Sequence, residues 1–168
     1  MELWEAIDTR RSAAKLAAPG PTPAHLERIV AAAGRAPDHG RLRPWRVIVL
    51  DDAARGRFAD AVVAARRART PVPTEEQLAV ERDKVWRSPT VVVVGCSVAR
   101  DHPKVPEVEQ LLSVGAAVQN MFLAAHDLGY GVMWKTGPAA YEAGVKAAVG
   151  LAPDDHIAAI LHLGTRVG

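Results

Sequence analysis

Short apolar runs alternate with amphipathic stretches along the chain, and this pattern predicts a fold that mixes helices and strands. In six stretches the apolar residues recur every three or four positions, which places them on one face of a helix. These stretches are residues 3–9, a segment beginning at Thr22-Pro23, a segment beginning at Asp51-Asp52, and residues 74–86, 108–128 and 141–149.

Four shorter runs are rich in β-branched or apolar residues and are predicted to be strands. They are residues 45–50, 90–96, 131–135 and 157–163. The run at 90–96 contains four consecutive valines, which is typical of a strand covered on both faces. We therefore expect an α+β fold with a mixed, mainly antiparallel sheet flanked by helices, and with residues 90–96 inside that sheet.

The stretch at 108–128 is apolar over most of its circumference. A helix with apolar residues all round is either the axis of the domain or part of an interface between subunits. The pattern leaves both possibilities open.

Composition narrows the class of protein. A chain of 168 residues that is 49% hydrophobic is expected to form one domain over residues 1–168. The net charge of +2 is too small to indicate a nucleic acid or an anionic membrane as partner. The start of the chain lacks the apolar core of a signal peptide, and a lone Cys96 excludes an internal disulfide, so we expect a cytoplasmic protein.

The sequence lacks several common catalytic motifs, and their absence narrows the possible chemistry. There is no histidine or cysteine pair with the spacing of a zinc site, no glycine-flanked serine and no phosphate-binding loop. We therefore expect no metal and no catalytic nucleophile from the protein itself. Cys96 is interpreted as a buried apolar residue.

Three clusters remain as candidate binding residues. Arg10, Arg11 and Ser12 follow the first helix and offer charge-assisted hydrogen bonds to a phosphate, although a solvated basic helix end is the simpler interpretation of this cluster alone. Arg35 and His39 lie in a loop with Pro and Gly between a helix and a strand, where binding groups often concentrate.

The third cluster follows the strand at 131–135. Trp134, Lys135 and Thr136 could border a planar, electron-accepting ring, because they combine an aromatic ring, a cation and backbone donors. Taken alone, Trp134 is as well explained as a core residue.

The order of these segments resembles the nitroreductase superfamily, in particular its compact YdjA-like branch, over Leu3 to Thr165. That family opens with a helix and an Arg-Arg-Ser signature, followed by Arg-Ala-Pro and then Pro-Trp before the first strand. This chain has Arg10-Arg11-Ser12, Arg35-Ala36-Pro37 and Pro44-Trp45, and it is also similar at residues 102–106, 131–137 and 163–165.

The resemblance implies a three-layer sandwich that forms a homodimer, with one FMN per subunit bound at the interface. It further implies an FMN-dependent oxidoreductase that takes electrons from NADH or NADPH and reduces nitroaromatics, quinones or similar electron-poor molecules by a ping-pong scheme. Arg10, Arg11 and Ser12 would hold the phosphate and ribityl side of FMN, Arg35 and His39 would come from the facing loop, and Trp134, Lys135 and Thr136 would border the isoalloxazine ring.

The chain departs from the wider family at two places. Ala14 stands where a basic residue is common, and Lys15 is the neighbouring candidate to replace it. Arg41 and Arg43 stand in a loop where Ser, Asn and Gln are common, so contacts of that loop to the flavin ring are open.

Two other functions remain as alternatives. The first is a flavin-storing or flavin-degrading protein of the same fold. The second is a basic interaction module in which the arginines of residues 66–69 contact an acidic partner.

Overall fold

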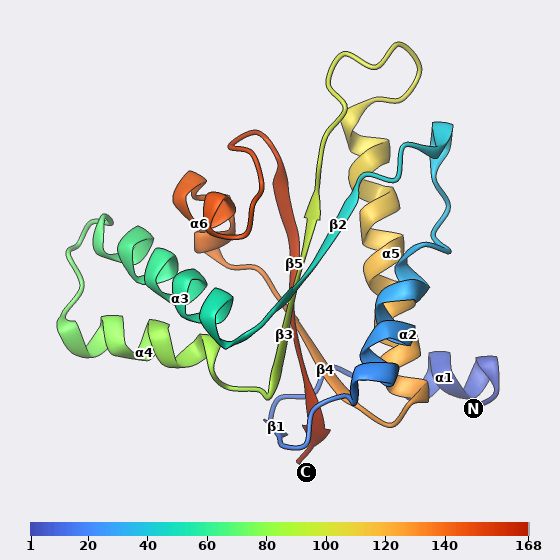
Figure 1. Ribbon diagram of the computed structural model, residues 1–168, viewed down its shortest axis with the longest axis horizontal. Coiled ribbons are helices and arrows are strands. Elements are labelled where there is room, and N and C mark those ends of the chain that lie inside the picture. The colour runs from blue at the N-terminus through green and yellow to red at the C-terminus, as the bar shows by residue number, and fades with distance from the viewer. Residues whose placement is uncertain (168) are drawn as a thin grey trace.

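The computed structural model describes residues 1–167, which form a sheet with helices on both faces (Figure 1). The helices are α1 (Leu3–Thr9), α2 (Pro23–Ala33), α3 (Asp52–Arg67), α4 (Glu75–Val85), α5 (Glu107–Asp127) and α6 (Ala143–Ala148), with 3-10 turns η1 (His39–Arg41) and η2 (Pro138–Tyr141). The strands are β1 (Leu16–Ala17), β2 (Trp45–Leu50), β3 (Thr90–Cys96), β4 (Gly131–Lys135) and β5 (His156–Arg166).

Local signals set the starts of the helices where the sequence predicts them. Thr22 caps α2 with its side chain, and Pro23 follows in the first turn. Asp51 caps α3, while Thr74 and Gln77 form a reciprocal capping box at the start of α4. These capping residues supply acceptors to backbone N–H groups that have no partner inside the helix.

The last third of the chain differs from the prediction in its boundaries. The helix expected at 141–149 is shortened to α6, because η2 occupies the residues after Gly137, whose φ of +76° is left-handed. The strand expected at 157–163 extends to Arg166 because its end pairs with β1, a two-residue strand that the pattern did not predict.

All strand pairs are antiparallel, and the order along the sheet is β1-β5-β3-β2, with β4 also paired to β5. A single parallel bridge between Ser12 and Val132 makes the pairing mixed. The prediction of a mixed, mainly antiparallel sheet is confirmed. So is the interior position of β3, which lies between β2 and β5.

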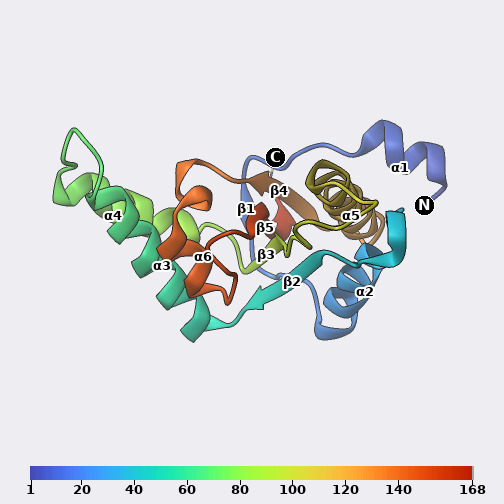
Figure 2. The ribbon, with the colours of Figure 1, turned by 90° about the horizontal axis from the view of Figure 1, so that it is seen from above.

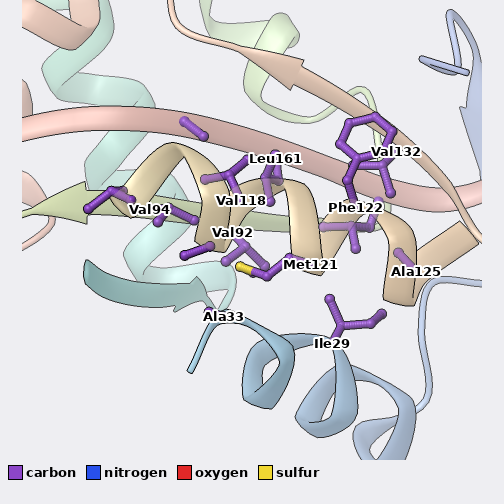
Figure 3. Packing of buried hydrophobic residues seen from close by; sticks show 14 of the residues in the cluster. Ile29, Ala33, Val92, Val94, Val118, Met121, Phe122, Ala125, Val132 and Leu161 are labelled. Atoms are coloured by element: carbon purple, nitrogen blue, oxygen red, sulfur yellow. The ribbon is translucent and has the colours of Figure 1, made fainter. Parts of the chain in front are cut away.

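Alternate valines of β3 point into two separate cores. Val92 and Val94 pack with Ile29 of α2 and Met121 of α5 on one face of the sheet (Figure 3). Val91 and Val93 pack on the other face, under α3 and α6. Seen from above, α2 and α5 therefore lie on one side of the sheet, and α3, α4 and α6 on the other (Figure 2). The predicted three-layer sandwich is confirmed.

Across residues 1–167, none of the helices combines the length and the apolar character that a membrane crossing requires.

Candidate functional site

The segment of the Arg-Arg-Ser signature is fixed along the edge of the sheet. The N–H of Ala13 donates a hydrogen bond of 2.9 Å to the carbonyl oxygen of Val132 in β4, next to the bridge formed by Ser12. Gly131 permits this close approach, because a Cβ there would lie 2.7 Å from a Leu16 methyl group and 2.9 Å from the Ala13 Cβ. Backbone pairing therefore holds Ser12 and Ala13 against β4.

Two arginines meet around His126 at the end of α5. Arg10 caps α1, and its guanidinium lies over the ring of Phe122, 4.9 Å from the centroid. Burial is the main cause of a lowered pKa for His126, and the charges of Arg166 and Arg10 lower it further. Both arginines therefore lie within electrostatic reach of His126, at the end of α5.

Sequence analysis did not find Arg166, because it lies beyond the predicted end of the last strand. Only the pairing of Arg166 with Leu16 across β1 and β5 carries it to the signature. No ion pair within residues 1–167 engages Arg10, Arg11 or Arg166, so their positive charge is available to an anion.

A cavity of about 610 Å³ lies on the α3 and α4 side of the sheet. Phe58, Val62 and Ile160 give it an apolar wall toward the core, and the remaining lining includes four cations. The cations are Arg66, Arg69, Lys84 and Lys135. A volume in this range, with an apolar wall and polar groups around it, is typical of a small-ligand site.

Two of the four cations are already paired. Lys84 forms an ion pair of 2.5 Å with Glu81, and Arg69 one of 2.8 Å with Glu142. Arg66 and Lys135 have no ion pair within residues 1–167, so the cavity keeps a positive potential.

A second, small cavity of about 40 Å³ lies next to the residues that follow the signature. Ala13, Ala14 and Leu16, which follow the signature, line it together with Arg87 and Met133. Lys135 and His162 line both cavities. The two cavities are therefore neighbours, and the small one reaches Ala13 and Ala14 directly after the signature.

His162 is a buried polar residue that sequence analysis missed. It belongs to β5 and pairs in register with Val91 and Met133, and its Nδ1 lies 3.0 Å from the Oγ of Ser88. Burial lowers its pKa to about 4, and the positive charges of Lys135, Arg55 and Arg87 act in the same direction. The alternation of residues in the predicted strand could have indicated that His162 shares a face with Ile160.

The structure brings some of the predicted residues together and not others. Lys135 and Thr136 line the large cavity, whereas Trp134 lies on the other face of β4, lines neither cavity and donates its indole N–H to the carbonyl oxygen of Ala158. The three residues therefore do not form one surface around a ring.

His39, in the loop that follows Arg35, is remote from the signature within one chain. His39 contacts Glu109 at the start of α5, with Nδ1 2.5 Å from Oε2, whereas Arg10 contacts Phe122 near its end. At 1.5 Å per residue, the 13 positions between Glu109 and Phe122 separate the two groups by about 20 Å along α5. In Figure 1, η1 accordingly lies at the opposite end of α5 from α1.

Residues 1–167 contain no group of three or more His, Cys, Asp or Glu side chains arranged to hold a metal ion.

The fold is an α+β sandwich with two neighbouring cavities that share Lys135 and His162, and these form its candidate ligand site. The chain matches the model of the nitroreductase family over residues 7–165, and it belongs to that family. This confirms the resemblance that the signature residues indicated.

A relative and two solved structures illustrate the match. YdjA of Escherichia coli strain K12, a predicted NAD(P)H nitroreductase, is 34% identical over 165 residues, which cover 98% of this chain and 88% of YdjA. A nitroreductase-like protein from Bacillus cereus superposes with a TM-score of 0.84 at 24% identity, over 100% of this chain and 87% of the other. A nitroreductase with bound FMN from Bacteroides fragilis superposes with a TM-score of 0.75 at 20% identity, over 99% and 89% of the two chains.

Proposed function

We propose that this protein is an FMN-dependent oxidoreductase that uses NADH or NADPH to reduce nitroaromatics, quinones or similar electron-poor small molecules. The observation that carries the proposal is the position of Ala13 and Ala14, which directly follow the signature and line a small cavity that shares Lys135 and His162 with the large cavity. A ligand with an anionic group at one end and a flat ring at the other fits this arrangement. FMN has that shape, and the B. fragilis relative binds it.

The phosphate end of FMN fits the region around the signature, near the end of α5. Arg10, Arg11 and Arg166 supply guanidinium groups that have no ion pair within residues 1–167, and Ser12 supplies a hydroxyl group. Guanidinium donors bind phosphate in a bidentate, charge-assisted way.

The ring end fits the large cavity. Phe58, Val62 and Ile160 offer an apolar wall, and Lys135 with Thr136 lies at its edge. When bound, FMN supplies the two-electron redox chemistry that no side chain of this protein provides. The cations Lys135 and Arg66 favour negative charge in this cavity, which is the electrostatic contribution expected from the protein.

NAD(P)H and the acceptor would use the same cavity in turn, because each must reach the flavin ring that we place there. We therefore propose ping-pong kinetics, for which initial-rate plots at several acceptor concentrations are parallel. Intersecting lines would contradict the use of one shared site.

Visible spectroscopy tests the proposed function most directly. The purified protein, alone or after incubation with FMN, should show a bound flavin spectrum that bleaches with anaerobic NADH or NADPH and returns when a quinone or nitroaromatic is added. A protein that cannot be loaded with FMN would overturn the proposal. A bound flavin that NAD(P)H does not bleach would favour storage of flavin.

We also propose a homodimer with two FMN sites at the interface. Large apolar side chains are exposed near both ends of α5. Val108 and Leu112 at its start are 59% and 68% exposed, and Leu3 and Trp4 of α1, which contacts the other end, are 65% and 73% exposed. Exposed apolar side chains of this size are typical of a protein interface. A second copy would also supply the facing loop, which lies about 20 Å from the signature along α5 in one chain.

The basic segment at 66–69 gives little support to an interaction module. Arg67 pairs with Glu75, Arg69 pairs with Glu142, and Arg66 lines the large cavity. A cytoplasmic location, which we also propose, agrees with the buried free thiol of Cys96.

A further inference from the structure

His162 occupies the junction between the two cavities, where the signature side of the site meets the large cavity. Only 6% of its surface is exposed, so it is a buried polar side chain that must satisfy its hydrogen bonds within the protein or with a ligand.

The hydrogen bonds of Ser88 determine which nitrogen of His162 carries the proton. The single hydroxyl proton of Ser88 is donated to the carbonyl oxygen of Thr90, at 3.0 Å. The Ser88 Oγ, 3.0 Å from the His162 Nδ1, must then act as acceptor toward that nitrogen. Nδ1 therefore holds the proton, and Nε2 holds the lone pair.

The Nε2 of His162 reaches the cavity. Nε2 forms no hydrogen bond within residues 1–167. In that part of the chain, every side-chain nitrogen or oxygen atom that is fully shielded from solvent does have a hydrogen-bond partner, so Nε2 is not fully shielded. Nε2 is consequently accessible from the cavity and can accept a hydrogen bond from a ligand.

The small cavity offers no other strong acceptor among the side chains that line it. Arg87 and Lys135 can only donate, and the remaining side chains are apolar or, for Met133, a weak acceptor. A hydroxyl group entering this junction would therefore donate to His162 and accept from Lys135 or Arg87.

We propose that His162 Nε2 accepts a hydrogen bond from a hydroxyl group of the ribityl chain of bound FMN, and that Ser88 is the positioning residue that holds the imidazole in the required tautomer. This inference rests on the proposed function. With the phosphate at the signature and the ring in the large cavity, the ribityl chain spans the junction where His162 lies.

Titration of FMN into the apoprotein, followed by flavin fluorescence, tests the proposal in wild type, His162→Phe and Ser88→Ala. Each protein is also titrated with an FMN analogue whose ribityl chain is replaced by an unsubstituted five-carbon chain ending in phosphate. We expect His162→Phe to bind FMN about threefold to tenfold more weakly, which is the worth of one hydrogen bond, and to bind the analogue as the wild type does. Ser88→Ala should show the same selective loss to a smaller degree.

Nitrogen-15 NMR of the histidine side chains provides a readout that needs no variant. In the wild type, the resonance of the unprotonated Nε2 should move on addition of FMN and stay in place on addition of the analogue. A resonance that responds equally to both ligands, or variants that lose affinity equally for both, would overturn the inference alone. Failure of the wild type to bind FMN would overturn the proposed function with it.

Discussion

The guanidinium of Arg10 lies over the ring of Phe122, 4.9 Å from its centroid, which joins the end of α1 to the long helix α5. Phe122 is only 3% exposed, so its ring is a fixed platform. A cation–π contact orients the guanidinium without occupying its N–H groups. Arg10 is thus held in place while it keeps donors available for a phosphate.

Replacing Arg10 and Ser12 together by Ala should therefore weaken FMN binding by roughly tenfold to a hundredfold or more, because at least one hydrogen bond between charged groups is lost. Fluorescence titration measures the effect. Affinity for riboflavin, which has no phosphate, should change little. Arg57→Ala, at an exposed position on α3, is the control and should bind FMN as the wild type does. Full retention of FMN by the double variant would refute the phosphate assignment.

Leu112→Glu should disrupt the proposed homodimer, because it places a charge in the exposed apolar surface of α5. Light scattering coupled to size-exclusion chromatography should show the mass of a monomer, and FMN retention should fall at the same time. Val80→Glu is the matched control, since Val80 is an exposed apolar residue of α4, on the other side of the sheet. A wild-type protein that is monomeric at all concentrations would contradict the interface.

His162 should make stability depend on pH in a defined window. Its pKa is about 4 in the folded protein and near 6.5 when unfolded, so the unfolded chain binds more protons between these values. The free energy of unfolding should consequently fall as the pH is lowered from about 6.5 to about 4, by at most about 3 kcal/mol from this residue.

Urea unfolding at several pH values checks this dependence by comparing wild type with His162→Gln. Because carboxylates titrate near the low end of the same window, the informative quantity is the difference between the two slopes. The variant should show the shallower slope between pH 4 and pH 6.5. Identical slopes would show that His162 does not carry the effect.

Arg55 should contribute strongly to stability even though it is charged. It is 5% exposed, stacks on Trp86, and donates to the carbonyl oxygens of Val85, Ser88 and Pro89. Arg55→Ala leaves these buried acceptors without donors and should cost about 2–4 kcal/mol in urea unfolding. Arg57→Ala, which removes a solvated side chain, should stay within about 0.5 kcal/mol of the wild type. Equal effects of the two substitutions would contradict this account.

Helix starts and buried strands could be predicted from the sequence because the signals that specify them lie within a few residues of one another. The capping box at Thr74 and Gln77 joins positions three residues apart, and the run of valines at 90–96 has the same apolar character in any register. The strand β1 was missed because two residues carry no periodicity. It forms only because Leu16 pairs with Arg166 across the sheet.

The candidate site could be predicted only in part, because some of its residues are far apart in the sequence. Arg10, Arg11 and Ser12 are consecutive, so the sequence alone indicated that they could bind a phosphate. The nearby Arg166 was missed because only strand pairing brings it to that signature.

The sequence alone determined the order of the elements, the class of fold and the family, because these depend on local periodicity and on contiguous motifs. Only the tertiary structure decided which side chains share a cavity. The pleat of β4 sends Trp134 to one face and Lys135 to the other, while β5 brings His162 beside Lys135. Such neighbours arise from the register between strands that are distant in the sequence, and no local pattern encodes them.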